Sequence, residues 1–355
     1  MGLGHKIIAR PLLALMDSEK AHSRALYLLR FVSFTILGRL FLRVLYSSKQ
    51  VNTECFGLSF RNPLGLAAGM DKNAEAMRGW KNLGFGFIEV GGVTMLEQSG
   101  NPKPRMFRST KDGALVNRMG FNNQGSEKIS NRLRGVGKIG IPVFLNIGKS
   151  KDTSLDDAHE DYATTVERCG KFVDGIVINV SSPNTPQLRE LQNEDHLETI
   201  IKSVQKHSSD KPVLVKIAPD LEDQQICEIV DVARSLGCAG IIATNTTVER
   251  PNEIGVMNET GGLSGRPLSS RSTTIIRLIA DYTDGQWPII GVGGISTADD
   301  AWDKITNGAS LLQIYTALVF EGAGVVKKIV NGLDKKLKVA GLSNLQDAVG
   351  LARRK

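Results

Sequence analysis

Hydroxyl and amide side chains gather in the stretch NVSSPNTPQLR, residues 179–189, directly after the apolar run GIVIN. An asparagine side chain both donates and accepts hydrogen bonds, so several together suit a planar ligand rich in amide groups. Serine, asparagine and proline are also ordinary turn and helix-cap residues. Two interpretations therefore stay open here: Ser182 and the neighbouring asparagines contact a ligand, or the stretch is only a turn.

Lysines and glycines mark other places where chemistry is possible. Lys216 lies inside VKIA, where its charge is hard to solvate, which favours an anionic or electron-rich partner over a solvated position. Gly293 and Gly294 follow another apolar run, and backbone N–H groups at such a turn can cradle a phosphate. Gly265, in GGLSGRP, allows a further close approach of the backbone. Asp71 is the one acidic residue that we expect beside these groups.

Eight short apolar runs precede these residues, each followed by polar or glycine residues and then by a helical pattern. Runs that are apolar throughout are typical of strands buried on both faces, and eight βα repeats predict a (β/α)8 barrel. An open, doubly wound sheet is the alternative, but no GxGxxG opens the first unit. The runs begin and end at residues 63–69, 86–90, 142–147, 175–180, 212–217, 240–244, 288–292 and 310–315.

Active sites of such barrels lie at the carboxyl ends of the strands, so the residues after each run should form one ring. That ring collects lysines, amides and hydroxyls and contains no metal-like cluster. Two long segments, 101–123 and 245–271, show little regular pattern and are predicted as functional loops. Within the first, Asn117, Arg118, Met119, Gly120 and Phe121 mix residue types as a ligand-contacting turn does, although a plain loop would look the same.

The net charge of +7 over 355 residues is concentrated at the start of the chain. Residues 1–50 hold eight Lys/Arg and two acidic residues, a net charge of +6, so nothing in the rest of the chain favours nucleic-acid binding. This segment is also apolar, but arginines interrupt it, which argues against a membrane span. It reads either as an interfacial element on an anionic membrane or as an amphipathic helix docked on the core.

The four cysteines are scattered, which indicates a reducing compartment and no disulfide framework. We divide the chain into an N-terminal helical segment (1–48), the barrel (49–340) and a C-terminal tail (341–355).

The motifs together resemble the dihydroorotate dehydrogenase family. Those that carry the resemblance run in order from about residue 50 to residue 330 and include NPLGLAAGMDK, NRMGFNN, NVSSPNTPQLR, VKIAPDL, TGGLSGRPL and IIGVGGI. The resemblance implies an FMN-containing barrel that oxidises dihydroorotate to orotate in pyrimidine synthesis. Within the family, one class uses a catalytic cysteine and soluble acceptors, whereas the membrane-associated class uses serine and reduces quinone.

This chain has Ser182, no cysteine within ten residues of it, and an N-terminal extension with DSEKAH at 17–22, which resembles the second class. We therefore expect a peripheral membrane protein with membrane quinone as the acceptor. The cytoplasmic side of a bacterial inner membrane is favoured over the mitochondrial inner membrane. The alternatives are the class with a soluble acceptor, an FMN barrel that uses a nicotinamide cofactor, and a membrane-surface binding protein without catalysis.

The resemblance also implies roles for individual residues. Ser182 is implied as the base that takes the C5 proton of dihydroorotate, while the C6 hydride goes to flavin N5. The implied substrate contacts are Lys72, Asn117, Arg118, Met119, Gly120, Phe121, Asn179, Asn184, Asn245 and Thr246. The implied cofactor contacts are Ala68, Gly69, Met70, Asp71, Lys72, Gly92, Asn146, Asn179, Lys216, Thr244, Gly265, Gly293, Gly294, Tyr315 and Thr316. The implied quinone-side residues are His22, Arg105 and Tyr315.

At one position the chain departs from the family pattern. The family usually places Ser or Thr against the flavin after the second strand, where this chain has Gly92. We therefore expect no side-chain contact there, and a backbone contact at most.

Overall fold

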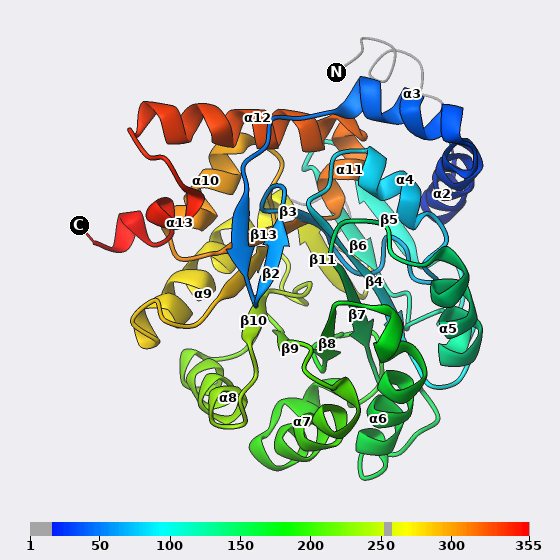
Figure 1. Ribbon diagram of the computed structural model, residues 1–355. Coiled ribbons are helices and arrows are strands. Elements are labelled where there is room, and N and C mark those ends of the chain that lie inside the picture. The colour runs from blue at the N-terminus through cyan, green and yellow to red at the C-terminus, as the bar shows by residue number, and fades with distance from the viewer. Residues whose placement is uncertain (1–15, 252–257, 355) are drawn as a thin grey trace.

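The computed structural model describes residues 16–251 and 258–354, and its centre is a closed barrel of eight parallel strands (Figure 1). The last strand pairs with the first, which closes the ring and confirms the predicted (β/α)8 class over an open sheet. All eight predicted runs overlap a strand. In chain order these are β3 (Leu64–Leu66), β4 (Phe87–Val93), β7 (Val143–Ile147), β8 (Gly175–Asn179), β9 (Val213–Ile217), β10 (Gly240–Ala243), β12 (Ile289–Val292) and β13 (Leu311–Ile314).

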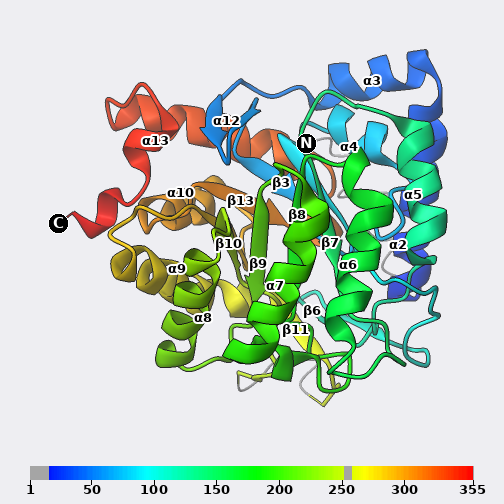
Figure 2. The same ribbon diagram turned by 60° about the horizontal axis from the view of Figure 1, so that its bottom comes forward.

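Helices surround the barrel, as strands buried on both faces require (Figures 1 and 2). Their apolar stripes face the strands; α7, for example, buries Leu197, Ile200, Ile201 and Val204. The helices are α4 (Met77–Asn82), α5 (Gly125–Val136), α6 (Ala158–Cys169), α7 (Glu194–Ser208), α8 (Asp223–Ser235), α9 (Ser269–Tyr282), α10 (Ala298–Thr306), α11 (Thr316–Glu321), α12 (Gly324–Val339) and α13 (Leu345–Ala348).

An antiparallel pair of strands, β1 (Thr53–Cys55) and β2 (Leu58–Phe60), lies across the amino end of the barrel (Figure 1). The Phe60 ring meets the Phe87 ring edge-on at a centroid distance of 5.4 Å, and Phe87 meets Phe144 at 5.8 Å. These rings fill that end of the barrel with apolar contacts. Polar side chains are therefore left to gather at the opposite, carboxyl end.

The two segments predicted as long irregular loops contain strands, which corrects that prediction. β5 (Met106–Ser109), β6 (Ala114–Asn117) and β11 (Gly262–Gly265) form one antiparallel sheet, with β11 pairing to β6. Neither segment shows a pattern of its own because each strand is short and depends on a partner far away in the sequence. Figure 2 shows β6 and β11 below the barrel strands. Residues 252–257 of the second segment lie outside the described residues.

The N-terminal segment forms two helices, α2 (Ser18–Phe34) and α3 (Ile36–Tyr46), which contact α4 (Figure 1). Asp17 caps α2 by accepting hydrogen bonds from the backbone N–H groups of Glu19 and Lys20 at 3.1 and 3.0 Å. Among the described residues, neither helix alone is long and apolar enough to cross a membrane; the pair passes such a test together but is bent by 114°. Residues 1–15 of the predicted 1–48 segment lie outside the described residues.

Candidate active site

One pocket at the carboxyl end of the barrel brings together most of the residues predicted to bind ligands. They come from the ends of seven barrel strands and from the two insertions. Those that line it are Ala68, Gly69, Lys72, Gly92, Asn117, Met119, Gly120, Phe121, Asn179, Ser182, Asn184, Lys216, Thr244, Asn245, Thr246, Gly265, Gly293, Gly294, Tyr315 and Thr316. The turn from Asn117 to Phe121 thus faces the pocket at four of its five positions.

A chain of hydrogen bonds links the amides of neighbouring strands. Glu89 Oε1 accepts from Asn146 Nδ2 at 2.6 Å, and Asn146 Oδ1 accepts from Asn179 Nδ2 at 3.0 Å. Asn179 Oδ1 accepts from Asn245 Nδ2 at 3.2 Å, and the same Nδ2 donates to Ser181 Oγ at 2.9 Å. Each amide is held in one orientation, so the pocket presents a fixed pattern of donors and acceptors.

Glu89 and Gln313 are functional candidates that our sequence reasoning missed. Glu89 is fully buried, and its Oε1 lies 3.6 Å from Lys216 Nζ. Gln313 Nε2 donates to the other Glu89 oxygen, while Gln313 Oε1 is buried without a partner in the described part of the chain. The available signal was a single acid in GFIEV and a single amide in SLLQIY, since polar residues are rare in fully buried strands.

Ser182 lies in the loop after β8, is 7% exposed, and lines the pocket. Its Oγ accepts a hydrogen bond from the backbone N–H of Asn184 at 3.3 Å. Asn184 Nδ2 in turn donates to Asn117 Oδ1 at 3.2 Å, which joins this loop to the β6 insertion. Thr185 follows, and its buried Oγ1 has no protein partner within residues 16–251 and 258–354. The loop therefore holds Ser182 in place and carries a buried hydroxyl without a protein partner in the described residues.

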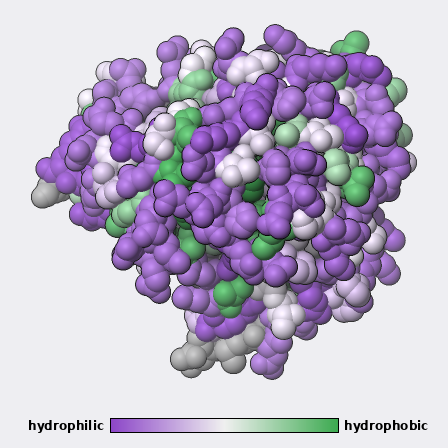
Figure 3. Space-filling model, turned by 90° about the horizontal axis from the view of Figure 1, so that it is seen from below, coloured by the Kyte–Doolittle hydropathy of each residue, from purple (hydrophilic) through white to green (hydrophobic). Residues whose placement is uncertain are grey.

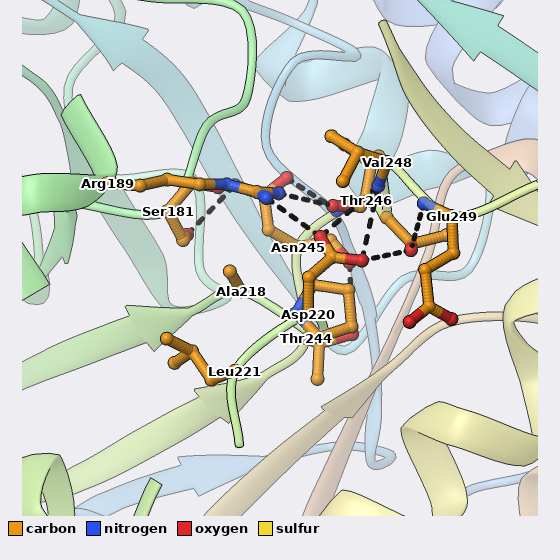
Figure 4. Close-up of polar contacts among 12 residues, drawn as sticks. Ser181, Arg189, Ala218, Asp220, Leu221, Thr244, Asn245, Thr246, Val248 and Glu249 are labelled. Carbon is orange, nitrogen blue, oxygen red and sulfur yellow. Dashed lines mark hydrogen bonds and ion pairs between the residues drawn. The ribbon is translucent and has the colours of Figure 1, made fainter. Parts of the chain in front are cut away.

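An ion pair between Arg189 and Asp220 joins three of the loops around the pocket (Figure 4). Arg189 Nη1 lies 2.8 Å from Asp220 Oδ2, and Arg189 also donates to the backbone carbonyls of Ser181 and Thr246 at 3.1 and 3.0 Å. Asp220 accepts from the backbone N–H of Val248 at 3.2 Å. The loops after β8, β9 and β10 are thus held together, although no local pattern indicates this pairing.

The predicted phosphate cradle lies beside the start of α9. A Cβ at Gly294 would lie 2.4 Å from Ser269 Cβ, so only glycine allows this close approach. Lys304 Nζ donates to the Ser269 carbonyl at 3.2 Å and to Ser272 Oγ at 3.1 Å. Burial lowers the pKa of Lys304 to about 8. Burial disfavours the charged form of Lys304, so an anion bound at the turn in front of it would stabilise that charge. The sequence analysis did not identify Lys304.

Gly92 has no room for a side chain, in agreement with the expectation that only its backbone is available. A Cβ on Gly92 would lie 2.6 Å from the Phe121 ring, which occupies that space. Gly92 still lines the pocket, so a backbone contact with a ligand stays open there.

Four predicted contacts do not line the pocket: Met70, Asp71, Arg118 and Asn146. Both Asp71 oxygens are occupied by the backbone N–H groups of Glu75 and Ala76, at 2.7 and 2.8 Å, and by the Trp80 indole at 3.0 Å. The prediction that Asp71 contacts a cofactor therefore has no support in the structure. Asp71 instead orders the segment that leads into α4.

Arg118 and Asn146 also have other partners than a ligand. Arg118 Nη1 lies 2.8 Å from Glu259 Oε2, and its guanidinium stacks on the Phe107 ring at 4.5 Å. Asn146 sits within the chain of hydrogen bonds from Glu89, so it orients Asn179.

The predicted quinone-side residues group around Glu19 of α2. Arg105 donates to both Glu19 oxygens, at 2.7 and 3.0 Å, which attaches α2 to the barrel. Burial lowers the pKa of His22 to about 3, with Lys72 adding to the shift. Burial raises the pKa of Tyr315, and the Glu19 charge raises it further. Tyr315 lines the pocket, whereas His22 and Arg105 lie outside its lining.

The fold and the site define a (β/α)8-barrel protein with a pocket lined by amides, lysines and glycines at the carboxyl end of its strands. Comparison with known proteins places it further. The chain belongs to the dihydroorotate dehydrogenase family, whose sequence model, described as "Dihydroorotate dehydrogenase", matches residues 50–337.

Similar proteins match most or nearly all of this chain. A protein of Gloeobacter violaceus named "Dihydroorotate dehydrogenase (quinone)" is 49% identical over 97% of this chain and 98% of its own. One of the same name from Halobacterium salinarum is 50% identical over 85% of this chain and 86% of its own. The crystal structure of DHODH from Eimeria tenella in complex with ferulenol is 39% identical, with a TM-score of 0.87 over 95% of this chain and 96% of its own.

Proposed function

We propose that this protein oxidises dihydroorotate to orotate, with FMN in the described pocket and a membrane quinone as the electron acceptor. The observation that carries the proposal is the position of Ser182 in one pocket with the linked amides and Lys216. The names of the similar proteins support quinone over a soluble acceptor. The serine at this position, with no cysteine within ten residues, supports the same choice.

The residues present fit FMN at two places. Gln313 Oε1 is a buried acceptor without a partner among the described residues, and it lies beside Lys216 and Glu89 in the wall of the pocket, where a ring N–H could satisfy it. The turn at Gly294, with Lys304 behind it, fits a phosphate.

FMN, when bound, supplies the redox chemistry by accepting a hydride and passing electrons to the acceptor. The candidate residues to hold it are Ala68, Gly69, Lys216, Thr244, Gly265, Gly293, Gly294, Tyr315 and Thr316.

The amides of the pocket suit the substrate. Dihydroorotate carries ring amides and a carboxylate, so its ring needs fixed donors and acceptors and its carboxylate needs a cation. Asn117, Asn184 and Asn245 supply the first, because each is already held by a neighbouring side chain. Lys72 can supply the second: burial lowers its pKa to about 8, and a bound carboxylate would stabilise its charged form.

Ser182 is the group that we assign to proton removal. A serine hydroxyl is a weak base, so it needs a fixed position and a path for the proton. Its Oγ is held by the Asn184 N–H, and Pro183 and Pro186 restrict the loop. The unsatisfied Thr185 hydroxyl is a place where a water could bind and receive the proton.

The N-terminal helices supply the proposed membrane contact. Ten of the fourteen large hydrophobic side chains that are exposed in the described residues lie between Tyr27 and Leu45, on α2 and α3. The side of the barrel seen in Figure 3, on which α6 and α7 lie, is mainly hydrophilic. Such a one-sided apolar surface suits peripheral binding rather than a span. We propose that residues 1–48 lie on the cytoplasmic face of a bacterial inner membrane and admit quinone to the barrel, residues 49–340.

The proposal is tested on the purified full-length protein. We expect a flavin absorption spectrum that bleaches when dihydroorotate is added without oxygen, and that recovers on addition of a long-chain quinone. Protein that carries flavin but is not bleached by dihydroorotate would contradict the substrate. Recovery that is as fast with fumarate or a nicotinamide dinucleotide as with quinone would favour the soluble-acceptor alternatives.

A further inference from the structure

A groove beside the N-terminal helices collects positive charge. It lies between α3, α4 and the loop after α5, and five cationic side chains line it. These are Arg39, Arg43, Arg78, Lys81 and Lys138, together with Ile36, Leu40, Asn82 and Ile139. No acidic residue is among the lining residues, and in residues 16–251 and 258–354 none of the five cations lies within 4.0 Å of a carboxylate.

Two of these cations donate hydrogen bonds to neutral backbone carbonyls. Arg39 donates to the backbone carbonyls of Ser33 and Phe34, and Arg78 donates to that of Val136. Burial lowers the pKa of Lys81, and the nearby charges of Arg61 and Arg43 lower it further. Like charges held together without counter-charges repel one another, so an anion bound among them would relieve that repulsion.

The groove borders the exposed apolar surface of α3. Ile36 and Leu40 line it and are 76% and 55% exposed, and Leu37, Phe41 and Val44 on the same helix are also exposed. A molecule with apolar chains against α3 would therefore present its polar end to the arginines. Guanidinium groups bind phosphate oxygens through paired hydrogen bonds.

We propose that this groove binds the phosphate headgroup of an anionic membrane phospholipid. This proposal rests on the proposed membrane contact of α2 and α3, and it names the lipid class and the residues that recognise it. The apolar residues at the groove favour a lipid over free phosphate or nucleic acid, neither of which offers acyl chains to Ile36 and Leu40. The absence of any carboxylate from the described lining favours an anionic headgroup over a zwitterionic one, whose ammonium would be repelled.

The test compares two double variants of the full-length holoenzyme. Arg43→Gln/Lys81→Gln removes two charges from the groove. Lys206→Gln/Arg234→Gln removes two exposed charges from α7 and α8, on the opposite side of the barrel, which form no ion pair within the described part of the chain (Figure 1). Binding is measured to phosphatidylcholine vesicles with and without about 30% phosphatidylglycerol. At about 1 kcal/mol per basic residue, the groove variant should bind the anionic vesicles roughly 30-fold more weakly, and the control within about twofold of wild type.

The remaining outcomes separate this inference from the proposed membrane contact. Equal weakening in both double variants would show a diffuse charge effect and overturn the site. Wild-type protein that binds neutral and anionic vesicles alike would also overturn it, while leaving membrane contact intact; failure to bind either would contradict the membrane contact itself. The charge-preserving variant Arg43→Lys/Lys81→Arg guards against misfolding and should keep most of the binding. A duplex oligonucleotide can be added at a phosphate charge equal to that of the anionic lipid. If it eliminates binding to the anionic vesicles, the groove would be a nucleic-acid site instead.

Discussion

Glu89 and Lys216 form a buried ion pair inside the barrel, with Glu89 Oε1 3.6 Å from Lys216 Nζ and both residues at most 5% exposed. The two residues lie on β4 and β9, which are not neighbours in the barrel. Glu89 also accepts hydrogen bonds from Asn146 and Gln313, so one carboxylate orients three groups around the pocket.

Replacing Glu89 by Ala should destabilise the protein by about 3–5 kcal/mol, because the charge of Lys216 would be left buried without its partner. Urea unfolding measures this change. Glu97→Ala is the matched control: Glu97 pairs with Lys128 at the surface, where both side chains are more than half exposed, and its loss should cost less than about 1 kcal/mol. Equal losses of unfolding free energy in the two variants would show that the buried pair contributes no more to stability than the surface pair.

Replacing Ser182 by Ala should slow reduction of the bound flavin by dihydroorotate roughly 10²–10⁴-fold, because the group assigned to proton removal is lost. Stopped-flow absorbance measures the rate. Flavin content should stay normal, since we assign Ser182 to the substrate and not to the flavin. Asn193→Ala, at the cap of α7 outside the pocket, is the control and should leave the rate unchanged. Reduction of the Ser182 variant at the wild-type rate would exclude Ser182 as the base.

Replacing Arg189 by Gln should slow the same step by roughly 10–100-fold, because the loop that holds Ser182 would lose its attachment to the loops after β9 and β10. Arg189 is a positioning residue, so the effect should appear in both the substrate KM and the rate of flavin reduction. Asp220→Asn should act in the same direction, and the double variant should be less impaired than the two single effects combined. Additive effects would show that the pair does not act as one unit.

Removing residues 1–48 should spare the reduction of flavin by dihydroorotate and impair reoxidation by a long-chain quinone. The described pocket lies entirely beyond the cut, whereas His22 and the Glu19 partner of Arg105 are lost with α2. The two half-reactions are measured separately on protein with verified flavin content, and a small soluble dye serves as the control acceptor. Equal loss with quinone and dye would contradict a role of this segment in quinone access. The full-length protein should also leave anionic vesicles as salt is raised.

His22 should make stability depend on pH. Burial lowers its pKa to about 3 in the folded state, against 6.5 for the free side chain. The stabilisation that comes from keeping His22 neutral is therefore fully present above pH 6.5. It is lost as the pH falls toward 3, because only the unfolded chain takes up the proton in that range. The unfolding free energy of the wild type should fall between about pH 7 and pH 5.5. In His22→Gln this fall should be smaller by about 1 kcal/mol. His207, exposed in the last turn of α7, provides the control position. An unchanged pH dependence in the His22 variant would mean that His22 has the same pKa in the folded and the unfolded chain.

Much of this protein could be predicted from local patterns. The eight buried strands follow from apolar runs of suitable length, and the rule that barrel sites lie at the carboxyl ends of strands then predicts Ser182, Lys216 and Gly294 as neighbours. The cap at Asp17 likewise depends only on residues within one turn. These features are local because the information that determines them lies within a few positions of each residue.

Only the tertiary structure decided which polar side chains enter the pocket and which serve as supports. Asp71 follows a barrel strand as Ser182 does, yet Trp80 engages it elsewhere, and Arg118, in the turn predicted to contact a ligand, pairs with Glu259. Glu89 lies inside an apolar run and becomes the centre of a polar network because β7, β9 and β13 each bring a partner to it. A strand pattern specifies the position of a residue on its strand. The direction and the partners of the side chain depend on other strands, which are distant in the sequence and meet only when the barrel closes.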